Sequence, residues 1–147
     1  MARLNDSETK RLLGRVDDSM AIARRLFADL ARETADGGGV TRASYSDGEQ
    51  RAHRMFSACA ADIGLEITTD AAGNTYFTLP GSQRDAPQII TGSHLDSVPK
   101  GGNYDGAAGV VAGLAALAAI KEAGIVPAQD LSAMAVRSEE CGSWFGG

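Results

Sequence analysis

Five side chains that can bind a metal lie in two short segments of this chain. The run from Thr91 to Gly109 is rich in glycine and contains His94, Asp96 and Asp105. Glu139 and Glu140 follow the next apolar run. One imidazole with several carboxylates suits Zn²⁺, and ligand type leaves Mn²⁺, Co²⁺ and Ni²⁺ open. The two segments together predict a metal site, which is dinuclear if one carboxylate lies between two ions.

The spacing of His94 and Asp96 favours one arrangement of the two side chains. One residue separates them, so in an extended segment both point to the same side. A carboxylate in that position can hold a metal-bound imidazole in one tautomer and raise its basicity. By itself, the same pattern is also typical of an exposed loop pair.

The three other acidic residues each have an ordinary structural interpretation. Asp105 precedes Gly106 at the start of an expected helix, where alone it is predicted to be the N-cap. Glu139 and Glu140 alone would be a solvated surface pair. In extended chain they face opposite ways, so one can bind a metal while the other acts as a general base on water acidified by the ion.

The apolar pattern predicts the elements that bring these residues together. A helix is expected from Ser7 to about Thr34, and a second follows the Ser46–Glu49 capping box and stops at Gly64. Both are expected to pack on a sheet. The other predicted elements are a hairpin of strands 65–69 and 74–79, a strand at 88–91, a helix at 106–123 and a strand at 131–136.

The last strand, helix and strand form a βαβ unit, which indicates an α/β fold. Such a crossover makes the strands parallel, so their C-terminal ends point the same way. His94 and the Glu139-Glu140 pair are therefore expected at one sheet edge, where α/β proteins bind ligands. His53, on the second helix, is predicted to be a surface or core-edge histidine outside the site.

Composition excludes several classes of function. The chain has 147 residues and a net charge of −5, so it lacks the basic surface that nucleic-acid binding requires. It has no apolar leader and no apolar stretch long enough to span a membrane. The cysteines, Cys59 and Cys141, do not form a disulfide framework, so a cytoplasmic protein is expected.

Residues 92–113 read Gly-Ser-His-Leu-Asp-Ser-Val-Pro-Lys-Gly-Gly-Asn-Tyr-Asp-Gly-Ala-Ala-Gly-Val-Val-Ala-Gly. This run resembles the metal-site signature of the allantoate amidohydrolases and N-carbamoyl-L-amino-acid hydrolases, in the two-metal carboxypeptidase and aminoacylase superfamily. The likeness extends to Gly38–Arg42, Tyr45-Ser46, Gly64-Leu65, Asp70–Asn74, Ser138–Glu140 and Trp144-Phe145.

The resemblance implies a role for each candidate residue. His94 binds one metal, Glu140 binds the other and Asp105 bridges the two. Asp96 orients His94, and Glu139 is the base that activates the bridging water. The implied reaction is hydrolysis of a C–N bond in a small ureido or amide substrate, and complete members of the family are expected to be homodimers.

The chain also departs from the family pattern. Trp144 stands where Arg is common, which affects the expected substrate preference, and Ser97 replaces the usual Thr. The later histidine ligands and the smaller lid and dimerisation domain do not occur in residues 1–147. We therefore expect an N-terminal portion of the catalytic domain, with a partial mixed sheet and helices on its faces, that is inactive alone.

Two alternatives remain open at this point. The metal motif is shared across the superfamily, so a peptidase or aminoacylase is possible within the enzyme class. A non-catalytic fragment could instead act by association, pairing its exposed sheet edge with a copy of itself or with a missing half.

Overall fold

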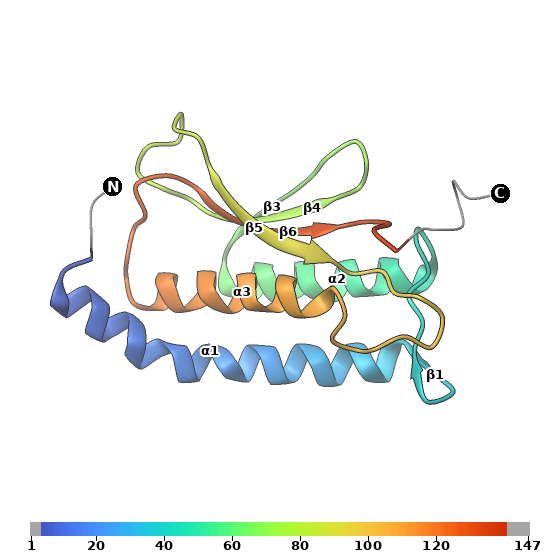
Figure 1. The fold of residues 1–147 in the computed structure, drawn as a ribbon. Coiled ribbons are helices and arrows are strands. Elements are labelled where there is room, and N and C mark those ends of the chain that lie inside the picture. Colours follow the sequence, from blue (N-terminus) through green and yellow to red (C-terminus); the bar gives the residue numbers. More distant parts are fainter. Residues whose placement is uncertain (1–3, 141–147) are drawn as a thin grey trace.

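The computed structural model describes residues 4–140, which form a mixed α/β fold with a four-stranded sheet (Figure 1). The elements in chain order are α1 (Asp6–Glu33), β1 (Ala35–Asp36), β2 (Gly39–Val40), α2 (Asp47–Ile63), β3 (Glu66–Thr69), β4 (Thr75–Leu79), β5 (Ile89–His94), α3 (Ala107–Glu122) and β6 (Leu131–Val136). Within the described residues, none of the helices has the length and apolar character needed to cross a membrane.

The sheet has the order β3-β4-β6-β5 and confirms the predicted hairpin and βαβ unit. β3, β4 and β6 are antiparallel neighbours, whereas β5 and β6 are parallel, with His94 opposite Val136. β5 is longer than the predicted 88–91 strand and ends on His94. β5 is an edge strand of this sheet, and Ile89 and Ile90 on it are exposed.

Small residues allow α3 to pack closely on β5 and β6. A Cβ added at Gly109 would lie 2.6 Å from the Cβ of Ser93, and one added at Gly113 would lie 2.8 Å from the Cβ of Ala133. Both distances are too short for carbon atoms in contact, so glycine is required. The close packing fixes the N-terminal end of α3 beside the end of β5.

The helices form two layers on one side of the sheet, as Figure 1 shows. α2 packs on β3 and β4, and α3 packs on β5 and β6. The expectation that the first helix packs on the sheet is wrong, because α1 lies mainly against α3. α3 is apolar on all sides, so it needs a second cover, and the buried Ala23, Leu26 and Leu30 of α1 provide it. Leu13 and Val16, nearer the start of α1, are exposed.

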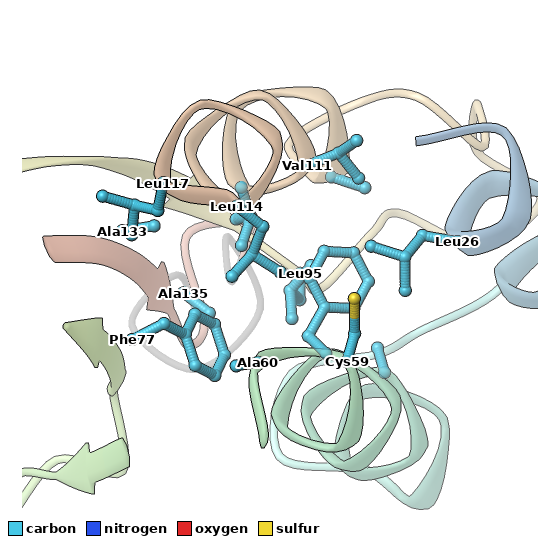
Figure 2. Packing of buried hydrophobic residues seen from close by; sticks show 14 of the residues in the cluster. Leu26, Cys59, Ala60, Phe77, Leu95, Val111, Leu114, Leu117, Ala133 and Ala135 are labelled. Carbon is cyan, nitrogen blue, oxygen red and sulfur yellow. The ribbon is translucent and has the colours of Figure 1, made fainter. Parts of the chain in front are cut away.

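The hydrophobic core lies where α2, α3, α1 and the sheet meet. Figure 2 shows Phe77 and Ala135 of the sheet facing Leu114 of α3 and Ala60 of α2, with Leu26 of α1 on the far side. Leu95, the residue after His94, is fully buried in this core. The core therefore anchors the segment that carries His94 and Asp96.

Two details at the helix starts differ from the prediction. The capping box is at α1, where Asn5 and Glu8 bond reciprocally. At α2, Ser46 is the N-cap, but its Oγ accepts from the Gly48 N–H and not from that of Glu49. The predicted Ser46–Glu49 capping box is therefore wrong, because the Glu49 carboxylate binds other groups in the interior.

A short hairpin of β1 and β2 brings the N-terminal part of the chain to the glycine-rich loop after β5. The N–H of Val40 donates to the Gly101 carbonyl at 3.0 Å, and the N–H of Gly101 donates to the Val40 carbonyl at 2.9 Å. The N–H of Ser97 donates to the carbonyl of Arg42 at 2.9 Å. Residues 40–42 therefore form one side of the candidate site.

Candidate metal centre

The predicted site residues converge at the C-terminal ends of β5 and β6. The Nδ1 atom of His94 lies 3.2 Å from Asp96 Oδ1 and 3.1 Å from the Asp96 carbonyl oxygen. Both are acceptors, so the ring hydrogen belongs on Nδ1 and the Nε2 lone pair is free to bind a metal. Nε2 lies 3.9 Å from Asp105 Oδ1 and 3.5 Å from Glu139 Oε2. Asp96 therefore lies where it can hold the His94 ring in one orientation.

Asp96 links both halves of the site. Its side chain is fully buried. Oδ1 accepts from the Glu139 N–H at 3.1 Å, and Oδ2 accepts from the Glu140 N–H at 2.9 Å and from Ser44 Oγ at 2.8 Å. One carboxylate therefore holds the imidazole of one segment and the backbone of the other.

The Glu139-Glu140 pair lies in a turn, so the expectation that the two side chains face opposite ways is wrong. Ser138, just before the pair, has φ of 61°, which takes the chain out of the extended conformation. A ring nitrogen of His94 and a carboxylate oxygen from each glutamate all lie within 4.8 Å of one another. Both glutamates therefore reach the same space as His94.

Asp105 is not the N-cap of α3. The N-cap is Gly106, which makes no side-chain cap bond. The Asp105 side chain is 60% exposed and lies beside His94. Gly106 has φ of +64°, and an added Cβ would overlap the His94 ring, 2.6 Å from Nε2. Glycine at this position lets the helix start approach the imidazole and leaves the Asp105 carboxylate available as a ligand.

The donor set fits a divalent metal. It combines one imidazole nitrogen with the carboxylates of Asp105, Glu139 and Glu140, which are the ligand types that Zn²⁺, Mn²⁺ and Co²⁺ accept. Four carboxylates, counting Asp96, surround one imidazole, and such an excess of negative charge favours bound cations.

Arg42 is a buried part of the site that the residue-by-residue sequence reasoning missed. Its Nε donates to the carbonyl of Leu95 at 2.6 Å and its Nη2 to the carbonyl of Asp105 at 3.4 Å. Burial lowers the pKa of the guanidinium, and the Asp96 and Asp105 carboxylates oppose this shift. Arg42 therefore ties the His94 segment to the Asp105 loop. Its place in the Gly38–Arg42 run of the family resemblance is the one signal in the sequence.

His53 is outside this group of residues, as predicted, but it is buried and does not lie on the surface. Its Nδ1 lies 3.0 Å from Thr75 Oγ1 on β4. Burial, together with the charge of Arg137, lowers the pKa of His53 to about 4. Cys141 and the Trp144-Phe145 pair lie outside the described residues.

Comparisons with known proteins agree with this fold. Residues 74–145 match the model of Peptidase family M28. The allantoate amidohydrolase of Bacillus subtilis (strain 168) is 41% identical over 108 residues, which are 74% of this chain and 26% of that protein. The N-carbamoyl-L-amino acid amidohydrolase of Geobacillus stearothermophilus is 39% identical over 103 residues, which are 70% of this chain and 25% of that protein.

A solved structure shares the fold as well. The hydantoinase/carbamoylase family amidase from Burkholderia ambifaria superposes with a TM-score of 0.79 at 35% identity, over 84% of this chain and 30% of that chain. These matches show that the chain is related to the allantoate amidohydrolases and N-carbamoyl-L-amino-acid amidohydrolases, which confirms the resemblance. The chain spans about a quarter of the length of the two curated relatives.

Proposed function

We propose that this chain supplies part of a two-metal centre that hydrolyses a C–N bond of an N-carbamoyl amino acid or a related ureido substrate such as allantoate. The observation that carries the proposal is the free Nε2 of His94, which faces Asp105 and Glu139 while Asp96 holds Nδ1. The names of the relatives support the substrate class.

In this proposal, His94 would hold one ion and Glu140 the other, and Asp105 would be a ligand of both. Bound divalent ions would polarise the substrate carbonyl and lower the pKa of the attacking water. The chain's own contribution is to hold these ligands rigidly, through the bonds of Asp96 to His94 Nδ1 and to the N–H groups of Glu139 and Glu140.

Glu139 is the proposed general base. Its carboxylate is 59% exposed and lies 3.5 Å from His94 Nε2, so it is both at the centre and open to a substrate. It can accept a proton from the attacking water and transfer it to the leaving nitrogen. Asp96 binds the backbone N–H of Glu139 and so limits how far the carboxylate can move.

We further propose that residues 1–147 are the N-terminal portion of the catalytic domain of a cytoplasmic, homodimeric enzyme that uses Zn²⁺. Because the chain spans about a quarter of its curated relatives, the remaining metal ligands and substrate contacts are expected elsewhere in the complete enzyme. An incomplete ligand set binds metal weakly, so the 147-residue chain is expected to hydrolyse nothing alone.

A chimeric enzyme tests the proposal. Residues 1–147 replace the matching segment of the Geobacillus stearothermophilus amidohydrolase, and N-carbamoyl amino acids, allantoate and dipeptides are offered with Zn²⁺. Hydrolysis of a ureido substrate is expected, with a loss of about 100-fold or more in kcat for Glu139→Gln. Glu122→Gln, an exposed change at the end of α3, is the matched control and should leave the rate unchanged. Cleavage of dipeptides alone, or full activity of Glu139→Gln, would contradict the proposal.

A further inference from the structure

A buried ion pair lies behind the turn that carries Glu139 and Glu140. Glu49, in the first turn of α2, is fully buried, and Arg137 follows the last residue of β6. Arg137 Nη1 donates to Glu49 Oε2 at 2.9 Å, and the Arg137 side chain is 10% exposed. Neither residue was among the site candidates, since a pair 88 positions apart in the sequence has no local signal.

The same two side chains bind the backbone on both sides of them. Glu49 Oε2 also accepts from the N–H of Tyr45 at 2.7 Å, and Arg137 Nε donates to the carbonyl of Gly73 at 2.9 Å. The N–H of Arg137 donates to Asn74 Oδ1 at 2.9 Å. The start of α2, the β3–β4 turn and the end of β6 therefore meet at this pair.

Glu49 holds the first residue of the turn in an uncommon conformation. The N–H of Ser138 donates to Glu49 Oε1 at 3.0 Å, and the φ of Ser138 is 61°. A left-handed conformation is unfavourable for a non-glycine residue, so it persists only where neighbours hold it. The next two N–H groups, of Glu139 and Glu140, donate to Asp96. Two buried carboxylates thus hold three consecutive backbone N–H groups.

We propose that Glu49 and Arg137 are positioning residues of the metal centre. They fix the turn at Ser138 so that Glu139 and Glu140 both face His94. The metal-binding consequence rests on the proposed function, whereas the position of the turn does not. A buried ion pair contributes little net stability compared with apolar packing, but loss of one partner leaves an uncompensated charge. The role of the pair is therefore best measured by how firmly the turn at residues 138–140 is held, and not by the stability of the fold.

The test compares Glu49→Gln and Arg137→Lys with the wild-type 147-residue chain. Arg137→Lys keeps the positive charge but loses the planar guanidinium group with its several N–H donors. It therefore remains informative if Glu49→Gln does not fold. Two readouts are taken: amide hydrogen exchange at residues 138–140, and Co²⁺ affinity from its d–d absorption. The expected result is loss of exchange protection at these three amides and about 10- to 100-fold weaker Co²⁺ binding.

Two controls separate positioning from charge and from stability. Glu66→Gln removes an equal charge from an exposed pair with Arg84, and Leu117→Ala destabilises α3 far from its N-terminal end. Both should keep wild-type Co²⁺ affinity and wild-type exchange at 138–140.

Unchanged exchange at these amides in both variants would overturn the inference, and so would wild-type Co²⁺ affinity in a variant whose amides had lost protection. If the wild-type chain bound no Co²⁺, the proposed metal function would fail, and amide exchange alone would decide whether Glu49 and Arg137 hold the turn.

Discussion

Asp96 holds both halves of the site, so Asp96→Asn should destabilise the fold measurably. The carboxylate accepts from three donors, Ser44 Oγ and the N–H groups of Glu139 and Glu140, and its Oδ1 lies 3.2 Å from His94 Nδ1. In asparagine one of the two oxygens becomes an NH₂ group, which cannot accept. At least one donor then loses its partner.

The least costly orientation places the NH₂ group at the position of Oδ2. The hydroxyl of Ser44 can turn to accept from it, but the N–H of Glu140 meets another donor. An unpaired buried donor costs about 1–3 kcal/mol of stability. A hydrogen bond to a charged acceptor contributes about 1 kcal/mol more stability than one to a neutral acceptor. The expected loss in the free energy of unfolding is therefore about 3 kcal/mol.

Urea unfolding followed by circular dichroism measures this loss, which corresponds to a decrease of about 2 M in the midpoint. Asp70→Asn is the matched control. Asp70 accepts from the N–H groups of Ala72 and Asn74, from Asn74 Nδ2 and from Tyr76, but it is exposed, so water replaces the lost bonds. A decrease for Asp96→Asn no larger than that for Asp70→Asn would refute the role of Asp96 as the link between the two segments.

Two further predictions concern His53 and Gly106. Between pH 6.5 and about 4, His53 binds a proton in the unfolded chain but not in the folded chain, where it is buried. The free energy of unfolding therefore falls as the pH falls through this window, by about 3 kcal/mol at its acid end. Urea unfolding of wild type and His53→Gln at about pH 7 and pH 4.5 should show that acidification lowers the free energy of unfolding less in the variant. Equal decreases in the two proteins would contradict the prediction. Gly106→Ala should weaken Zn²⁺ binding about 10-fold or more in calorimetric titration, because its Cβ overlaps the His94 ring. Gly102→Ala, with open space around it, should bind as wild type does, and equal affinities of the two variants would count against the geometry.

The elements of the fold were largely predictable because they depend on local pattern. The strand at Leu131–Val136 was predicted to the residue, and the first helix within one residue at each end. A strand–helix–strand crossover makes its two strands parallel, so the approach of His94 to Glu140 was also predictable. An amphipathic pattern shows that one helix face is buried but not what covers it, so the packing of α1 against α3 was not predictable.

The parts of the site that were missed depend on contacts between distant segments. Taken by itself, Asp105 was expected to cap the helix that follows, whereas the family resemblance made it a metal ligand; the N-cap is Gly106. The turn at Ser138 requires Glu49, and the loop at Asp105 requires Arg42. Their partners are 63 to 89 positions away in the sequence, where no periodicity or spacing indicates them.

The central claim is that His94, Asp105 and Glu140 bind a divalent metal. The most direct test is zinc K-edge X-ray absorption of the untagged, zinc-loaded chain, because His53 and His94 are the two histidines in its sequence. The prediction is one imidazole nitrogen at about 2.0–2.1 Å with carboxylate oxygens at about 2.0–2.2 Å. The imidazole signal should disappear in His94→Gln and persist in His53→Gln. An imidazole signal that persists in His94→Gln, or zinc bound by oxygen alone in the wild-type chain, would contradict the claim.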